Sequence, residues 1–251
     1  MKAKGFAGLL LFDARGYHDD HLPPPPPKME FMDPQWRRML QFSLREAARV
    51  GLTVSVNLSS CAGALRGPWS VGDEAPKQLV HAAQQIDGGR RFSAPAPKGD
   101  WGKTWEIALL AVRHAPTAPA ASAKSAPVAF DQLVDLSDKL GADGKLDWNA
   151  PPGRWTLLRF ACTVIPGHEN DVDILDAQAV TGHWQRMAQT VISDAGGPGG
   201  GLVGKTLTHF YSVSWEGATP TWTLKLTQEF RRRRGYDIIP HLPALAGFVR
   251  G

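Results

Sequence analysis

An acidic residue, Glu216, directly follows the aromatic, β-favouring run H-F-Y-S-V-S-W of residues 209–215. An acid at the last position of a strand points into the mouth of an α/β barrel, where the catalytic residues of such barrels lie. Burial beside aromatic rings raises the pKa of a carboxyl group and suits it to general acid catalysis. Glu216 is therefore the candidate catalytic residue, with Trp215 and Trp222 as candidate aromatic contacts for a substrate. The structural alternative is a glutamate that caps the next segment or pairs with an arginine.

Because alternate residues of a strand point to opposite faces, the run predicts a two-sided strand over residues 205–215. Its small and acidic face would point inward, and its bulky face would meet surrounding helices. The predicted inward face holds Thr208, Phe210, Ser212, Ser214 and Glu216, and the predicted bulky face holds Leu207, His209, Tyr211, Val213 and Trp215.

Polar residues also follow two earlier predicted strands, over residues 8–12 and 52–59. Residues at the ends of barrel strands and in the loops behind them commonly contact substrate. The alternatives are a turn residue for Asp13, an exposed polar loop for His18, and small inward-facing filler for Asn57 and Ser59. The residues that we expect to contact substrate are Asp13, His18, Asn57, Ser59, Arg66 and Trp69.

The segment H-E-N-D-V-D at residues 168–173 gathers oxygen ligands of the kind that calcium prefers. Asp171 and Asp173 are its candidate metal ligands. The segment lacks the glycine and the terminal glutamate of an EF-hand loop, so a solvated acidic loop is the alternative.

The chain begins as a βαβ unit. Asp33 and Pro34 predict a helix start, apolar residues then recur at helical spacing, and Gly51 ends the helix. From about residue 75 to 164 short alternating runs are punctuated by glycine and proline, which is typical of an all-β domain. Helical periodicity returns over residues 179–195 and again over about 223–233.

Only three strands of a parallel sheet are recognisable outside the β-rich segment, whereas a complete eightfold barrel needs about 250 residues of its own. The sequence therefore predicts a partial (β/α)8 barrel with an inserted, sandwich-like all-β domain. The predicted parts are residues 1–74 (barrel), 75–165 (insert) and 166–251 (barrel). An open barrel leaves strand edges unpaired, so we expect missing barrel strands or a second chain as a partner.

Composition excludes several classes of function. The net charge of +4 stems mostly from the run Arg231–Arg234, which we interpret as a solvated helix end and not as a nucleic-acid site. Cys61 and Cys162 have no metal-like spacing. The apolar stretch of residues 6–12 is too short for a signal peptide, no stretch is long enough to span a membrane, and no G-x-S-x-G elbow is present.

Five segments together resemble the catalytic region of glycoside hydrolase family 106, the α-L-rhamnosidases. They are F-A-G-L-L-L-F-D-A-R-G-Y, V-N-L-S-S-C-A-G-A-L-R-G-P-W, P-P-G-R-W-T-L-L-R-F, S-W-E-G-A-T-P-T-W and E-F-R-R-R-R-G-Y-D. Their order agrees with the family, and they are spread over nearly the whole chain. Nine tryptophans suit a protein that handles carbohydrate.

The resemblance implies inverting hydrolysis of terminal α-L-rhamnose in plant or microbial glycans, an association with calcium, no organic cofactor, and a secreted or periplasmic location. It also implies that the chain is truncated at both ends, and that the second catalytic carboxyl can lie beyond residue 251. The alternative is a carbohydrate-binding remnant that does not turn substrate over.

Overall fold

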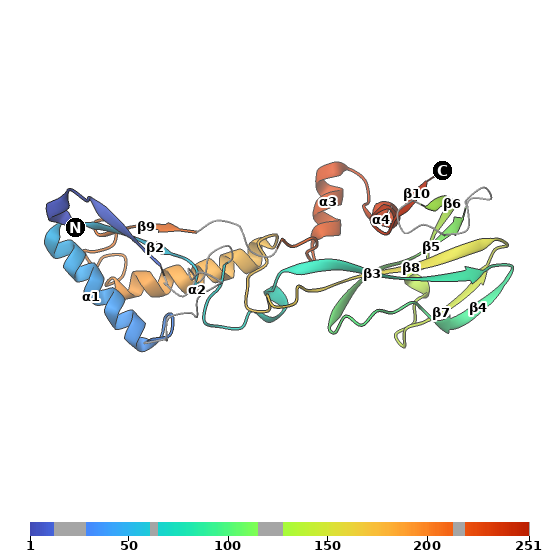
Figure 1. Ribbon diagram of the computed structural model, residues 1–251, viewed down its shortest axis with the longest axis horizontal. Coiled ribbons are helices and arrows are strands. Elements are labelled where there is room, and N and C mark those ends of the chain that lie inside the picture. Colours follow the sequence, from blue (N-terminus) through green and yellow to red (C-terminus); the bar gives the residue numbers. More distant parts are fainter. Residues whose placement is uncertain (13–28, 61–64, 115–127, 213–218, 251) are drawn as a thin grey trace. The chain divides into compact units, whose positions relative to one another are not determined.

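The computed structural model describes residues 1–12, 29–60, 65–114, 128–212 and 219–250 (Figure 1). The chain divides into two compact units. The first unit contains Met1–Pro76 and Ile165–Pro220, and the second contains Lys77–Val164 and Thr221–Gly251. Each unit has its own sheets and its own core.

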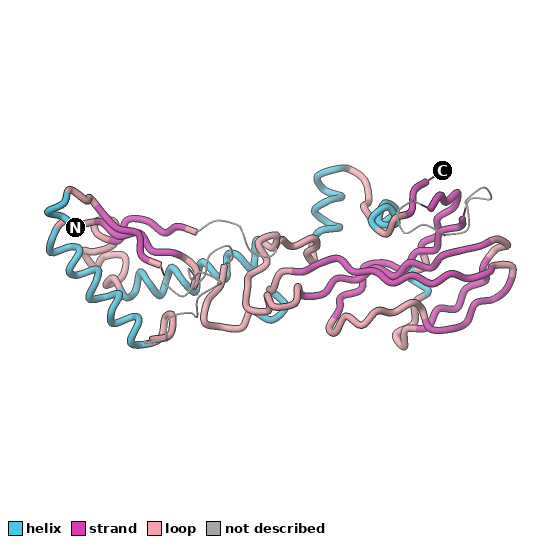
Figure 2. Tube along the Cα trace, in the orientation of Figure 1, coloured by secondary structure: helices cyan, strands magenta, loops and turns pink. Residues whose placement is uncertain are grey.

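The first unit is a three-stranded parallel sheet in the order β1-β2-β9. A helix precedes β2 and another precedes β9, so the chain runs β-α-β-α-β, as expected from the sequence (Figure 2). The elements are β1 (Gly8–Leu11), α1 (Pro34–Val50), β2 (Thr53–Asn57), α2 (Ala177–Asp194) and β9 (Leu207–Tyr211), with short 3-10 turns at Lys2–Lys4 and Gly72–Glu74.

Helix α1 begins and ends where the sequence predicts. The Asp33 side chain accepts a hydrogen bond from the Trp36 amide at 2.7 Å, and Pro34 occupies the first helical position. At the other end Gly51 adopts a left-handed conformation with φ of 71°, which costs glycine little. The cap prediction is confirmed at both ends.

The two helices bury one face of the sheet. Leu44 of α1 and Val191 of α2 pack with Val54 and Val56 of β2 in a single apolar cluster. The opposite face carries Leu10, which is 66% exposed. Within the described residues of this unit, one face of the sheet is thus covered and the other is open.

A charged contact fastens the two helices together. Arg37 of α1 donates two hydrogen bonds of 2.8 Å to the carboxylate of Asp194 at the end of α2. Gln41 adds a third hydrogen bond at 3.0 Å. The Asp194 side chain is only 4% exposed, so its hydration is replaced almost entirely by these donors.

The second unit contains a five-stranded sheet in the order β10-β6-β5-β8-β3 and a separate two-stranded sheet, β4-β7. Its pairings are antiparallel except for β10 with β6. The elements are β3 (Lys77–Asp87), β4 (Arg90–Pro95), β5 (Thr104–His114), β6 (Val128–Asp135), β7 (Lys145–Ala150), β8 (Arg154–Val164), α3 (Leu226–Arg234), α4 (Leu242–Leu245) and β10 (Phe248–Arg250), with 3-10 turns at Ser137–Lys139 and Ile239–His241.

Both faces of the five-stranded sheet are buried. One face packs on the small sheet, where Trp148 and Trp155 meet edge to face with ring centroids 5.1 Å apart. The other face packs against the C-terminal segment, which contributes Trp222 and Leu242 to a second apolar cluster. Cys162 is buried in that second cluster.

The C-terminal residues belong to a different unit from the one predicted. Residues 221–251, assigned from the sequence to the barrel, lie in the second unit. The reason is that Trp222 packs in its core and β10 extends its sheet beside β6. Helix periodicity located α3 correctly, but periodicity alone does not say which sheet a helix covers.

The arginine run at the end of α3 is solvent-exposed and partly ion-paired. Arg231 contacts Asp237, and Arg232 and Arg233 contact Glu229. Among the described helices, none is long and apolar enough to cross a membrane.

The β-rich segment leaves and re-enters the first unit at neighbouring points. The Ile165 amide donates to the Pro76 carbonyl at 3.0 Å. The next residues, Lys77 and Val164, are the first register pair of β3 and β8. The excursion is therefore closed at its base by continuous antiparallel pairing.

We expect Asp194→Ala to lower the free energy of unfolding of the first unit by about 1–3 kcal/mol, because three hydrogen bonds to a buried carboxylate are lost. Urea denaturation followed by circular dichroism measures this change. Glu46→Ala is the control. Glu46 also forms an ion pair with an arginine, Arg49, but on the exposed surface of α1. Glu46→Ala should leave the free energy of unfolding nearly unchanged, because an exposed ion pair contributes little. Equal effects of the two substitutions would contradict the role given to Asp194.

Candidate functional site

The carboxyl ends of the three parallel strands meet at one edge of the first unit's sheet. Their last residues are Leu11, Asn57 and Tyr211. The Tyr211 hydroxyl donates across this edge to the Leu11 carbonyl at 3.4 Å. Ligand sites of parallel α/β sheets lie at this edge, so it is the first place to look for function.

Four predicted site residues cannot be placed. Glu216, Trp215, Asp13 and His18 lie outside the described residues. Strand β9 ends at Tyr211, four residues before the predicted end of that strand. The catalytic assignment of Glu216 thus stays a prediction.

A bulge changes the faces of β9. The pairing with β2 shifts by one residue, because Val54 lies opposite Leu207 whereas Ser55 lies opposite His209. Thr208 is therefore an extra residue, and it reverses the alternation that follows. The predicted faces for residues 209–211 are wrong for this reason.

After the bulge, Phe210 faces the helices. It lies opposite Val56, and its ring meets Trp184 of α2 edge to face with centroids 5.3 Å apart. His209 and Tyr211 lie opposite Ser55 and Asn57, on the open face. The alternation that assigned Glu216 to the inward face consequently no longer supports that assignment.

Two buried polar residues mark the end of β2. The Asn57 amide donates to the Ser59 carbonyl at 2.9 Å, and Asn57 is 3% exposed. Ser59 is fully buried, and its hydroxyl oxygen accepts from the Arg66 amide at 3.0 Å. Ser59 thus fastens the returning chain, whereas Asn57 keeps its side-chain oxygen available.

Helix α2 brings a histidine to the same place. His183 is 1% exposed, and its Nε2 lies 2.6 Å from the Leu58 carbonyl oxygen. A carbonyl oxygen only accepts, so Nε2 carries the proton and Nδ1 of the neutral ring is an acceptor. The pKa of His183 lies below its ordinary value, chiefly because burial disfavours the imidazolium and also because of the charge of Arg186.

Three buried polar atoms near this end have no hydrogen-bond partner within the described residues. They are Asn57 Oδ1, Trp69 Nε1 and His183 Nδ1. Two of them accept hydrogen bonds and one donates. A buried polar atom without a partner costs free energy, so such atoms indicate a bound water or a ligand hydroxyl.

Trp69 is half-buried between two basic side chains. Its ring lies 5.7 Å from the His183 ring, measured between centroids. The Arg186 guanidinium lies 5.2 Å from the centre of the Trp69 ring and pairs with Glu74 at 3.1 Å. Trp69 was expected to stack on a sugar, but Arg186 already occupies part of its ring.

Arg66 is engaged in an ion pair. Its Nε lies 2.5 Å from one oxygen of Asp171, and the other oxygen lies 2.6 Å from Nδ1 of His168. Asp171 is 2% exposed. The expected substrate contact of Arg66 is therefore replaced, in this structure, by a fixed link between two loops.

The same contacts test the predicted calcium ligands. Calcium takes about six to eight oxygen ligands, but both Asp171 oxygens are already bound by basic groups. Asp173 is fully buried, and one of its oxygens accepts from the Leu175 amide at 2.9 Å. Within the described residues no cluster of three or more His, Cys, Asp or Glu could hold a metal. Both Asp171 oxygens are thus taken by basic groups, and the calcium expectation stays a prediction.

Trp222 does not belong to this site. It is 3% exposed in the core of the second unit, and its amide donates to the Lys77 carbonyl at 3.2 Å. A ring buried in this way offers no face to a sugar. The expectation for Trp222 failed because a tryptophan near an acid in sequence can belong to a different core.

His183 was not identified from the sequence. It lies on the buried face of α2 with Ala179 and Met187, at spacings of four residues. A histidine at a core position of an amphipathic helix was the available signal. Together, the described residues supply hydrogen-bonding groups suited to hydroxyls, while the predicted catalytic carboxyl lies outside them.

Comparisons with known proteins bear on the family and the fold of this chain. A model of the α-L-rhamnosidase family, glycoside hydrolase family 106, matches residues 1–119 and 107–251. The solved structure of a rhamnosidase from Novosphingobium sp. PP1Y superposes with a TM-score of 0.71 at 19% identity, covering 97% of this chain and 39% of the other. A protein from Formosa agariphila named "Putative beta-glucuronidase" is 25% identical over 281 residues, which cover 99% of this chain and 23% of that protein. The chain thus spans well under half the length of either relative.

The lowered pKa of His183 predicts a pH dependence of stability. The unfolded histidine takes up a proton as the pH falls below its ordinary pKa of 6.5, whereas the buried one resists protonation. The contribution is therefore complete above pH 6.5 and is lost as the pH falls through the folded pKa. Urea unfolding at several values between pH 5 and 8 should show a smaller fall in stability for His183→Gln than for the parent.

His209→Gln is the control, because His209 is exposed on the strand edge. It should keep the pH dependence of the parent. The buried His114 of the second unit also has a lowered pKa, and its contribution remains in all three proteins. If His183→Gln and the parent lose stability equally on acidification, the neutral, buried imidazole is not what the pH dependence reports.

Proposed function

The chain belongs to the α-L-rhamnosidase family, glycoside hydrolase family 106, and on that premise we propose that it forms part of a glycosidase that removes terminal α-L-rhamnose from plant or microbial glycans. The carboxyl edge of the parallel sheet would bind the sugar. Hydrolysis of this kind needs no organic cofactor.

The observation that carries this proposal is the set of unpartnered buried atoms at the end of β2. Asn57 Oδ1 and His183 Nδ1 accept hydrogen bonds, and Trp69 Nε1 donates one. A sugar hydroxyl both donates and accepts, so it can complete such a set, whereas an apolar ligand cannot. Neutral His183 suits this role, because the imidazolium would have no acceptor to offer.

The proposed reaction is inverting hydrolysis by two carboxyl groups. Glu216 donates its proton to the departing glycosidic oxygen as the bond to the anomeric carbon breaks. A second, ionised carboxylate takes a proton from water as the water attacks the opposite face. The two groups need to lie about 6.5–9.5 Å apart to admit that water. Asp13 is the nearest acidic residue after β1 in the sequence, but we leave the second group unassigned.

We further propose that this chain works as part of a longer protein or with a second chain. It covers 23% of one relative and 39% of another. Within the described residues, β1 and β9 each have an unpaired edge, and Leu10 on the open sheet face is 66% exposed. Further strands would pair these edges and cover this face, as closure of a (β/α) barrel does.

Two other functions are open to experiment. A chain without the second carboxyl would bind a rhamnoside without turnover. The relative named as a β-glucuronidase favours a uronic acid at the cleaved position as the second candidate substrate. Assays with an α-L-rhamnoside and a β-D-glucuronide therefore belong side by side.

We expect Glu216→Gln to lower kcat/KM on a methyl or disaccharide rhamnoside by about 100- to 10,000-fold, because the leaving oxygen then departs without a proton. The loss should be smaller on 4-nitrophenyl α-L-rhamnoside, whose leaving group needs little protonation. The parent and the variant are assayed both as the 251-residue chain and with any flanking coding sequence included.

Glu229→Gln is the control, because Glu229 pairs with arginines on the exposed surface of α3. It should keep the activity of the parent. Proton NMR of the first turnovers should show β-L-rhamnose before mutarotation, as inversion requires. Activity of Glu216→Gln within a few-fold of the parent on the unactivated substrate would remove Glu216 from the catalytic role.

A further inference from the structure

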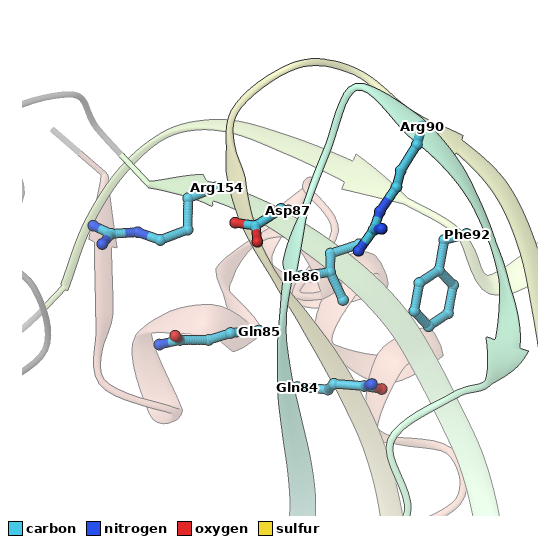
Figure 3. Close-up of a pocket in the computed structure, with 7 residues that line it drawn as sticks. All are labelled: Gln84, Gln85, Ile86, Asp87, Arg90, Phe92 and Arg154. Atoms are coloured by element: carbon cyan, nitrogen blue, oxygen red, sulfur yellow. The ribbon is translucent and has the colours of Figure 1, made fainter.

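The second unit has a surface pocket of its own, lined by residues of that unit alone. Its volume is about 330 Å³, at the lower end of the range of roughly 300–1,000 Å³ found for small-molecule sites. Figure 3 shows the pocket around the end of β3 and the start of β4. Its lining residues are Gln84, Gln85, Ile86, Asp87, Arg90, Phe92 and Arg154.

The pocket lies beside an unpaired strand edge. Strand β3 pairs with β8 on one side, while β4 pairs with β7 instead of with β3. At the beginning of β3 the outer edge is covered, because Thr221 and Trp222 donate to the Lys77 carbonyl. Beyond that point no described strand pairs with the outer edge of β3. Main-chain polar groups therefore border the pocket along with side chains.

Three polar side chains of this pocket have no side-chain partner among the described residues. Gln84, Asp87 and Arg90 make no side-chain hydrogen bond or ion pair with any described residue. The next arginine, Arg91, is by contrast bound through both ends of its fork to Asp147. Arg90 thus offers a planar set of donors that no carboxylate of the described chain occupies.

An apolar floor accompanies these groups. Ile86 and Phe92 are half-buried, and both pack on the core between the two sheets of this unit. Figure 3 shows the Arg90 guanidinium reaching toward Ile86, with the Phe92 ring beside it and the Gln84 amide below. The core thereby holds the floor in place while the polar groups stay open to a ligand.

The Asp87 carboxylate does not form an ion pair with the Arg90 guanidinium. Strand alternation places Asp87 on the face of β3 opposite Ile86, and its register partner across the sheet is Arg154. In Figure 3 Asp87, Gln85 and Arg154 accordingly lie on the other side of the strand. Arg154 donates to Nδ1 of His114 at 3.1 Å, so it is oriented away from Arg90.

These groups match one kind of ligand. A guanidinium fork binds a carboxylate through two parallel hydrogen bonds. An aromatic ring packs on the apolar face of a pyranose, and an amide binds hydroxyls by donating and accepting. The small pocket volume of about 330 Å³ favours a short ligand over a long peptide strand.

We propose that this pocket binds a uronic acid residue of an acidic saccharide, with its carboxylate on Arg90, its ring on Phe92 and a hydroxyl on Gln84. The site lies in a different unit from the proposed catalytic edge, and binding there needs no hydrolysis. It would hold an acidic glycan to the protein independently of cleavage.

Isothermal titration of the 251-residue chain with a trigalacturonate and with a neutral trigalactoside tests this proposal. We expect saturable binding of the uronate and binding weaker by about tenfold or more for the neutral sugar, because the charged hydrogen bonds are lost. Arg90→Gln should weaken uronate binding by a similar factor, and Phe92→Leu should weaken both sugars while keeping the apolar floor.

Arg91→Gln is the matched control, since it removes the same charge from the adjacent position of β4 and should bind as the parent does. Circular dichroism checks that each variant is folded. Equal affinity for the two sugars, or equal effects of the Arg90 and Arg91 substitutions, would overturn the proposal. So would full competition by acetate alone, which indicates an anion site, or by an extended peptide, which indicates strand pairing. Glu216→Gln should leave this binding unchanged, so failure of the catalytic proposal and failure of this one are distinguishable.

Discussion

The hydrogen bond from His183 to the Leu58 carbonyl, at 2.6 Å, determines much of the first unit's functional edge. It joins the buried face of α2 to the first residue after β2, across 125 positions of sequence. By holding the proton on Nε2 it leaves Nδ1 as an acceptor beside Trp69 and Asn57. A second contact lies next to it, because the Ser59 hydroxyl oxygen accepts from the amide of the returning chain at Arg66. The His183 contact thus couples the position of helix α2 to the hydrogen-bonding groups at the end of β2.

Charged side chains that are ion-paired within the chain differ in role from polar groups that have no partner among the described residues. In the first unit the buried carboxylates of Asp171 and Asp194 are enclosed by basic or amide partners, so they hold loops and helices together. In the second unit three strand arginines also form ion pairs with acids. They are Arg91 with Asp147, Arg113 with Asp131 and Arg159 with Glu106. Polar groups without a partner among the described residues are therefore candidates for ligand contacts. They occur at the end of β2, where the open atoms are neutral, and beside β3, where the open group is a cation. The proposed site at the end of β2 therefore requires hydroxyl groups from its ligand, whereas the proposed pocket beside β3 requires an acidic group.

The sequence predicts local features best and long-range ones least. The cap at Asp33, the stop at Gly51 and the alternation of β2 depend on neighbouring residues, and all are found. The bulge at Thr208 depends on how β9 pairs with β2, which is distant in the sequence. No residue type near Thr208 predicts it. Trp222 illustrates the same limit, since its burial depends on a sheet that the sequence does not show it to meet. His183 was visible as a histidine on an apolar helix face, but only the structure shows that its partner is a carbonyl at a strand end.

The hydrogen bond between Ile165 and Pro76 brings the two ends of an 88-residue excursion, Lys77–Val164, side by side. Because the two ends of this segment lie side by side, its length has little effect on the distance between the parts of the first unit that it joins. The entropy of closing such a loop grows only with the logarithm of its length, about 0.6 kcal/mol for each doubling. The length and sequence of this segment can therefore change in evolution while the packing of α2 on β2 is kept. Among relatives of this chain, length variation should accumulate between these two residues and spare the strand end at Asn57.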